Sequence, residues 1–216
     1  MTTVAVIDYG MGNLRSVAKA LEHVASAGTT VEVTASPERI LQADCVVFPG
    51  QGAARDCMAE LTQRGLVDVV KEAVRSKPFL GICMGLQVLL ESSEENGGTV
   101  GLGILPGSVR RFPDGMVDPQ SGDALKIPHM GWNQVHQTIP HPLWQGIPQD
   151  NRFYFVHSYY VAPTESDQVA GVTHYGTDFV CAMARGNVFA VQFHPEKSAG
   201  AGLALLANFL DWDGCV

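Results

Sequence analysis

The chain has 216 residues, of which 46% are hydrophobic and 17% are charged, and its formal net charge is −8. This composition predicts a folded chain with a substantial core, and the acidic balance argues against a nucleic-acid partner. No apolar run approaches the roughly 20 residues of a membrane span, and the first residues lack a signal-peptide pattern, so we expect neither a membrane partner nor secretion.

The cysteines indicate a reducing, cytoplasmic location. Their number is odd, no two form a CxxC pair, and they are scattered over positions 45, 57, 83, 181 and 215. A disulfide framework or a zinc site is therefore not expected. The spacing of His, Cys and Asp suggests no other metal site, and we expect no cofactor.

The first half of the chain alternates short apolar runs with segments of helical periodicity. The runs are apolar throughout, which is typical of parallel strands covered by helices on both faces. Glycine-bearing turns at 10–13, 49–52 and 83–85 would follow such strands, at the sheet edge where ligands bind. We expect strands at 3–8, 31–34, 44–48 and 79–83, and helices over 14–25, from Ser36-Pro37, over 66–74 and over 86–90.

The second half favours further strands joined by turns, which would extend the sheet in antiparallel fashion. Hairpin signals occur at Asp114-Gly115 and at 185–187, residues 113–124 predict an exposed loop, and Ser198 is expected to cap a last helix over 199–210. We expect one α/β domain, 1–216, with an open, mainly parallel sheet flanked by helices. The additional strands are expected at 104–112, 132–136, 152–160, 169–174, 179–184 and 188–193.

A candidate nucleophile lies at Cys83, within the sequence Gly-Ile-Cys-Met-Gly at 81–85. Glycines on both sides of a nucleophile allow the sharp strand-to-helix turn that exposes it. The helix N-terminus would favour the thiolate, and the Met84 N–H would point at an acyl oxyanion. The alternative is a small buried hydrophobic residue, which we expect for Cys45 and Cys181, whereas Cys57 is expected to be partly exposed.

A candidate base and its carboxylate partner occur at His194 and Glu196. In extended chain, residues two apart project to the same side, and Pro195 biases His194 toward that conformation. One imidazole nitrogen could then face a thiol while the carboxylate holds the other. His129, His157 and His174 are competing candidates, but neither of the first two is followed by an acidic residue two positions later.

Two glycine loops have different interpretations. Pro-Gly-Gln-Gly at 49–52 could bring backbone N–H groups close to a substrate oxygen, although for this motif in isolation a plain strand-to-helix turn is the favoured interpretation. The loop at 10–13 lacks the third glycine of a dinucleotide motif, because position 15 is arginine, and no Walker lysine follows it. We therefore reject a nucleotide-binding loop.

Taken together, G-I-C-M-G-L-Q at 81–87, P-G-Q-G at 49–52 and F-H-P-E at 193–196 resemble the class I, triad-type glutamine amidotransferases. Within that family, four segments resemble the glutaminase subunits of imidazole glycerol phosphate synthase. They are I-D-Y-G-M-G-N at 7–13, P-H-M-G-W-N at 128–133, Y-F-V-H-S-Y at 154–159 and Q-F-H-P-E-K-S at 192–198. The resemblance covers essentially the whole chain and implies a flavodoxin-like fold.

The resemblance also implies roles for individual residues. Cys83 would be the nucleophile, His194 the general base and then acid, and Glu196 the carboxylate that orients the imidazole. The oxyanion hole would be formed by the backbone at Gly50, Gln51, Gly52 and Met84. Glutamine would be bound by Gln87, by Glu95 (with Glu94 as an adjacent alternative) and by the backbone of Ser158 and Tyr159.

The resemblance further implies a partner, the cyclase (β/α)₈-barrel subunit, in a heterodimer. Asn13, Trp132, Tyr154 and Lys197 would lie toward this subunit, which would use the released ammonia to make imidazole glycerol phosphate and aminoimidazole carboxamide ribotide. Gln51 departs from the family pattern, in which a small apolar residue is more usual. Three alternatives remain at this point: a glutaminase for another synthase such as anthranilate synthase, a stand-alone cysteine hydrolase, and a non-catalytic regulatory relative.

Overall fold

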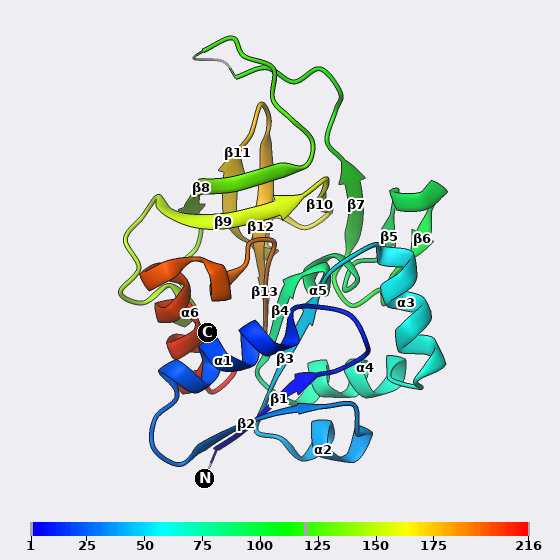
Figure 1. Ribbon diagram of the computed structural model, residues 1–216, viewed down its shortest axis with the longest axis vertical. Coiled ribbons are helices and arrows are strands. Elements are labelled where there is room, and N and C mark those ends of the chain that lie inside the picture. The colour runs from blue at the N-terminus through cyan, green and yellow to red at the C-terminus, as the bar shows by residue number, and fades with distance from the viewer. Residues whose placement is uncertain (1, 119–120, 216) are drawn as a thin grey trace.

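A computed structural model describes residues 2–118 and 121–215. One large mixed sheet runs through the molecule, with helices packed against it (Figure 1). The helices are α1 (Leu14–Val24), α2 (Pro37–Gln42), α3 (Ala54–Gln63), α4 (Val67–Ser76), α5 (Met84–Gln87) and α6 (Ala199–Asp211), with short 3₁₀ turns η1 (Glu95–Gly97), η2 (Pro142–Trp144), η3 (Ser166–Gln168) and η4 (Pro195–Lys197). The strands are β1 (Thr2–Ile7), β2 (Thr29–Thr34), β3 (Cys45–Gly50), β4 (Phe79–Cys83), β5 (Ser92–Ser93), β6 (Thr99–Val100), β7 (Gly107–Arg111), β8 (His129–Gln137), β9 (Asn151–His157), β10 (Tyr159–Pro163), β11 (Val169–His174), β12 (Asp178–Arg185) and β13 (Val188–Val191).

The sheet has a parallel part and an antiparallel part. Its main path is β2-β1-β3-β4-β13-β12-β10-β7-β5-β6, and the pairs from β2 to β13 are all parallel. From β13 to β7 the neighbours are antiparallel, and β11 links β12 to the hairpin of β8 and β9. The predicted α/β class, with a parallel sheet that continues into antiparallel strands, is confirmed.

The parallel strands are buried on both faces, which explains their uninterrupted apolar sequences. In β1, Val4 and Val6 pack into one core cluster and Ala5 and Ile7 into the other, as the alternation of side chains along a strand requires. Apolar residues of α1 and α6 complete the first cluster, and those of α2, α3, α4 and α5 complete the second. The sheet therefore lies between two helical layers, and its carboxyl-terminal edge is free to form a site.

The structure corrects several predicted boundaries. The strand expected over 152–160 is two strands, β9 and β10, because the chain bends at Ser158. The helix expected over 86–90 is the single turn α5, and α3 was not predicted. Asp114-Gly115 forms a turn but not a strand hairpin. It lies in the segment between β7 and β8 that extends from the sheet at the top of Figure 1. The described part of the expected 113–124 loop, which excludes 119 and 120, contains one bridge between Val117 and Ala124.

Ser198 occupies the N-cap position of α6, as predicted, but its side chain does not cap the helix. Its hydroxyl instead donates to the His194 carbonyl at 2.6 Å and accepts from the Tyr154 N–H at 2.9 Å. The residue therefore fixes the segment after β13 against β9. Within residues 2–118 and 121–215, no helix combines the length and apolarity needed to cross a membrane.

Candidate active site

Cys83 stands at the sharp turn between β4 and α5, with φ +57° and ψ −109°. A positive φ is unusual for a residue with a side chain and is found where a site requires it. The turn depends on Gly85, because a Cβ at this position would lie 1.9 Å from the Phe48 carbonyl oxygen. The predicted strained elbow is present, and it places the Cys83 thiol at the carboxyl-terminal edge of the sheet.

His194 reaches the same edge because β13 pairs in parallel with β4, with Val191 opposite Ile82. Its Nδ1 lies 2.9 Å from Glu196 Oε1, and the two side chains are 2% and 0% exposed. The backbone of His194 is held by the Tyr154 carbonyl, which accepts from its N–H at 2.9 Å. The predicted pairing of His194 with Glu196 is therefore present in the structure.

The second nitrogen of His194 is available for chemistry. Buried Nε2 has no hydrogen bond of normal geometry to any described residue. Burial alone would lower the pKa of His194, but the neighbouring Cys83 and Glu196 side chains outweigh it and raise the pKa to about 10. The raised pKa favours the imidazolium form beside the sulfur, and that form can give a proton to a leaving group.

None of the competing histidines presents a free nitrogen to the cavity beside Cys83. His157 uses Nδ1 on the Tyr159 carbonyl at 2.8 Å and Nε2 on His129 Nδ1 at 3.0 Å. The remaining nitrogen of His129 lies 3.3 Å from the Asn133 side-chain amide. His174 is exposed and pairs with Asp178. Hydrogen bonding and exposure thus support His194, the histidine that the sequence favoured.

The other cysteines lack the features of a nucleophile. Burial raises the pKa of Cys45 and of Cys181 to about 12 and that of Cys57 to about 11, so these thiols stay protonated. Cys57 is fully buried, and the expectation that it would be partly exposed is wrong. It lies on the inner side of α3, which the sequence had not predicted. Cys215 is exposed near the end of the chain.

A cavity of about 460 Å³ opens beside Cys83 and His194. Pro128, Val156 and His157 form part of its wall. The wall also contains eight further residues that the sequence analysis assigned to the site: Gln51, Gly52, Met84, Gln87, Glu95, Ser158, Tyr159 and Lys197. A second cavity of about 530 Å³, lined by Lys71, Arg75 and Arg185 among others, contains no cysteine or histidine. Among the described residues, no three His, Cys, Asp or Glu side chains gather into a set that could hold a metal ion.

The predicted oxyanion loop lies directly beside the nucleophile. Gly50 is paired with Cys83 across β3 and β4, and a Cβ on Gly50 would lie 2.5 Å from the Tyr9 hydroxyl and 2.8 Å from Met84 Cβ. The Gln51 carbonyl accepts a hydrogen bond from the Cys57 thiol at 3.4 Å. Glycine at position 50 is thus required by packing, and the carbonyl after it has a fixed partner.

The structure distinguishes the two adjacent acidic residues. Glu95 faces the cavity, and its Oε2 accepts the Ala54 N–H at 2.7 Å. Glu94 is exposed and accepts the Arg111 N–H at 3.0 Å. Only Glu95 is therefore placed to bind a group inside the cavity.

Gln87 is 3% exposed, and both of its amide hydrogens are used, one by the Tyr159 carbonyl at 3.0 Å and one by Gln192 Oε1 at 2.9 Å. Its Oε1 has no partner among the described residues, and Gln87 lines the cavity. A buried acceptor of this kind favours a ligand that carries an N–H group.

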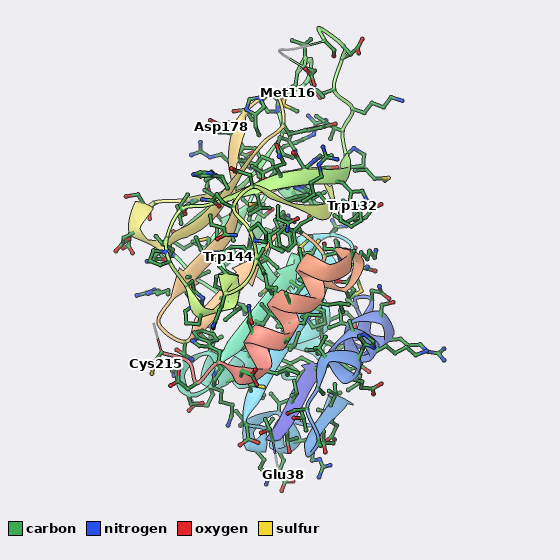
Figure 2. The ribbon with its side chains drawn as sticks, turned by 90° about the vertical axis from the view of Figure 1, so that its left-hand side faces the viewer. Glu38, Met116, Trp132, Trp144, Asp178 and Cys215 are labelled. Atoms are coloured by element: carbon green, nitrogen blue, oxygen red, sulfur yellow. The ribbon has the colours of Figure 1, made fainter. Side chains whose placement is uncertain are left out.

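Three of the four residues expected toward a partner lie together on the surface. Trp132, labelled at the right-hand side of Figure 2, is 50% exposed. Its ring lies 6.1 Å from that of Tyr154, and Lys197 Nζ lies 5.9 Å from the Tyr154 ring centroid. Lys197 also lines the cavity, so this cluster adjoins its mouth. Asn13 is half-buried at the start of α1, and no hydrogen bond, ion pair or ring contact among the described residues joins it to the other three.

Gln192 is a site residue that the motif analysis did not single out. It is fully buried, and its Nε2 lies 3.7 Å from the Cys83 sulfur. The available signal was its position two residues before His194, at the end of the strand predicted over 188–193, because residues two apart in extended chain project to one side.

Comparison with known proteins identifies the family. Residues 5–212 match the family described as glutamine amidotransferase class-I. The chain belongs to this family. Two relatives named imidazole glycerol phosphate synthase subunit HisH, from Thiobacillus denitrificans and Aromatoleum aromaticum, are each 63% identical to it. The first alignment covers 97% of this chain and 91% of the relative, and the second covers 98% and 99%.

A solved structure described as a glutamine amidotransferase has the same fold, with a TM-score of 0.71, 19% identity, and coverage of 96% of this chain and 97% of that one. The class-I glutamine amidotransferase fold is thus shared over nearly the whole chain. The resemblance found in the motifs is confirmed.

Proposed function

We propose that this glutamine amidotransferase is the glutaminase subunit of imidazole glycerol phosphate synthase and acts in histidine biosynthesis. The observation that carries the proposal is the placement of His194 beside Cys83 in one cavity wall, with Nδ1 bound to Glu196 and buried Nε2 left without a hydrogen-bond partner. The identity to relatives of that name over almost their full length supports the choice of synthase.

In the proposed reaction, the Cys83 thiolate attacks the side-chain amide carbon of glutamine. The carbonyl π electrons move to oxygen, and the N–H groups of Met84 and of the Gly50–Gly52 loop stabilise the oxyanion. The His194 imidazolium then protonates the departing nitrogen, which leaves as ammonia, and a γ-glutamyl thioester remains on the sulfur. Neutral His194 next takes a proton from water, and the hydroxide displaces the thiolate to give glutamate.

Binding of glutamine uses the cavity wall. The negative carboxylate of Glu95 and the unpartnered Gln87 Oε1 are suited to the substrate α-ammonium group, which offers only hydrogen-bond donors. The substrate carboxylate would take the N–H groups of the Ser158–Tyr159 backbone. Both ends of the amino acid are then fixed, and the amide carbon is brought to Cys83.

The partner would be the cyclase barrel subunit. Aromatic residues are enriched at protein interfaces, and the Trp132–Tyr154–Lys197 cluster supplies two of them beside the cavity mouth. Ammonia released there would pass to the cyclase, whose reaction yields imidazole glycerol phosphate and aminoimidazole carboxamide ribotide. We also propose that the free subunit has low activity and that docking completes the oxyanion hole through the Gly50–Gly52 loop.

The test is to measure glutamine hydrolysis by the purified chain alone and with the cyclase subunit and its nucleotide substrate, using Cys83→Ala as the control. Strong activation that is absent in the variant supports the proposal. Equal turnover with and without the cyclase would rule out activation by this partner. Activation by anthranilate synthase instead would show that the chain serves a different synthase. Hydrolysis of esters or peptides without glutamine selectivity would indicate a general cysteine hydrolase. Inactivity in every combination would indicate a non-catalytic regulatory relative.

A further inference from the structure

Two buried histidines face each other across the hairpin of β8 and β9. His129 and His157 are directly opposite in the register of these strands, and they are 3% and 6% exposed. His129 stacks between the rings of Phe155 and Tyr175, at centroid distances of 4.9 and 4.0 Å. Neither histidine has a role in the proposed acid–base chemistry, so their burial calls for another explanation.

Burial lowers the pKa of both rings, which are therefore neutral at pH 7, and the hydrogen bonds then determine the tautomer of each ring. The Tyr159 carbonyl can only accept, so His157 Nδ1 carries the proton and His157 Nε2 is an acceptor. His129 Nδ1, 3.0 Å away, must then be the donor, which leaves His129 Nε2 to accept from the Asn133 amide. Both neutral rings are therefore protonated at Nδ1. The hydrogen bonds that link Asn133, His129, His157 and Tyr159 all donate in the direction of Tyr159.

This series of hydrogen bonds ends at Tyr159, on the part of the backbone that forms the cavity wall. The Tyr159 carbonyl accepts from His157 Nδ1 at 2.8 Å and from Gln87 Nε2 at 3.0 Å, so both of its lone pairs are used. The Ser158 carbonyl accepts from the Phe112 N–H at 3.1 Å. In a trans peptide the N–H points opposite to the C=O, so the Tyr159 N–H points away from β7. The Ser158–Tyr159 and Tyr159–Tyr160 peptide groups thus have fixed orientations.

We propose that His129 and His157 are positioning residues that hold the Tyr159 carbonyl, and through it the Ser158–Tyr159 backbone and the Gln87 amide, in the orientation that binds glutamine. This inference rests on the proposed function, because it concerns the same cavity. It assigns no proton transfer to either histidine. It makes recognition of the substrate depend on residues that do not touch the reacting atoms.

The experiment compares His157→Phe with His157→Asn in the chain assembled with its cyclase subunit. Phenylalanine keeps an aromatic ring among Phe112, Phe155 and Phe179 but removes both nitrogens. Asparagine places an amide N–H near the position of Nδ1 and can still donate to the Tyr159 carbonyl. We expect His157→Phe to raise KM for glutamine about tenfold with kcat changed less than about threefold, as loss of one neutral hydrogen bond predicts. His157→Asn should restore KM to within about threefold of the unmodified chain.

Two further measurements keep the inference testable. His129 lies outside the cavity wall. His129→Phe should raise KM for glutamine about threefold, because His157 Nε2 loses its hydrogen-bond donor. Side-chain ¹⁵N NMR of the unmodified chain should show both histidines neutral and protonated at Nδ1, and it decides the matter where a variant does not fold. An unchanged KM in folded His157→Phe, or an Nε2–H or imidazolium form of either ring, would overturn the inference. A chain that hydrolyses no glutamine would refute the proposed function, and the ¹⁵N spectrum would still test the pair.

Discussion

Gln192 places its amide nitrogen 3.7 Å from the sulfur of Cys83. The same side chain accepts from Gln87 through Oε1 at 2.9 Å. The nucleophile therefore has an amide dipole on the side of β13, in addition to its histidine. A donor at this distance stabilises a thiolate more than a neutral thiol.

We expect Gln192→Leu to reduce kcat for glutamine hydrolysis by about 10- to 100-fold, the effect of losing a hydrogen bond to a charged group. The rate of Cys83 alkylation by iodoacetamide should fall in parallel, because the thiolate is the reactive form. Gln168→Leu is the matched control, since Gln168 is also a buried glutamine but lies in η3, outside the cavity wall. Equal alkylation rates in the Gln192→Leu variant and the unmodified chain would contradict this role.

Glu95→Gln should raise KM for glutamine by about 10- to 100-fold with a smaller effect on kcat, because the cavity loses the charge that faces the substrate α-ammonium group. The neighbouring Glu94→Gln provides the control, since Glu94 is exposed and bonded to the Arg111 backbone. Steady-state kinetics of both variants test the assignment. A larger rise in KM for Glu94→Gln than for Glu95→Gln would reverse it.

Gly85→Ala should lower the free energy of unfolding by about 3 kcal/mol or more, or prevent folding, because its Cβ would overlap the Phe48 carbonyl oxygen. Gly200→Ala in α6 is the control, since nothing lies within 4 Å of a Cβ there, and helix propensity predicts a stabilisation of about 0.5–1 kcal/mol. Urea unfolding measures both changes. A Gly85→Ala variant as stable as the unmodified chain would show that the turn after Cys83 tolerates a side chain.

Stability should fall in mild acid. Burial lowers the pKa of His129 and of His141 to about 4 and that of His157 to about 3, whereas the unfolded chain titrates near 6.5. Between pH 6.5 and 4 the unfolded state binds more protons than the folded state. The contribution of these three histidines to the free energy of unfolding is therefore complete above about pH 6.5 and is lost as the pH falls. The raised pKa of His194 acts in the opposite sense, because its contribution is complete below about pH 6.5 and is lost as the pH rises toward 10.

Urea unfolding at pH 7.5, 6.5 and 5.5 would measure this dependence, and each buried histidine should contribute about 1.4 kcal/mol per pH unit well below 6.5. His141→Asn should reduce the acid slope by the share of one histidine. It removes a titrating ring but retains an acceptor for the Leu143 N–H, which His141 Nδ1 accepts at 3.2 Å. A stability that does not change between pH 7.5 and 5.5 would contradict the neutral, buried state of these rings.

The sequence predicted the parts of the fold that depend on local pattern. The apolar runs and their glycine ends identified β4 with its observed bounds, 79–83, and the parallel core around it. The prediction failed where a single residue overrides the pattern. Residues 152–160 have the sequence pattern of one strand, but the chain bends at Ser158 and forms two. The helix after Cys83 is shorter than its leucine spacing suggests, because the chain leaves the helix to pack Leu89 and Leu90 beneath the following loop, whose N–H groups bond to their carbonyls.

The candidate site was predictable where a short motif determines which side chains meet. His194 and Glu196 are two residues apart, so their pairing followed from the local sequence. Glu95 could not be separated from Glu94, because the choice depends on which one faces α3. The His129–His157 pair could not be predicted at all. It arises from the register of β8 against β9, and no local pattern at either histidine specifies the opposite one.

The position of β13 has a consequence for synthesis of the protein. This strand comes near the end of the chain, yet it is inserted between β4 and β12 in the middle of the sheet. A nascent chain that has emerged only through β12 contains the nucleophile and the oxyanion loop but neither the histidine nor the glutamate. Under the proposed mechanism, the growing polypeptide cannot consume glutamine on the ribosome. A chain truncated before β13 would leave two central strand edges open to pairing with other molecules.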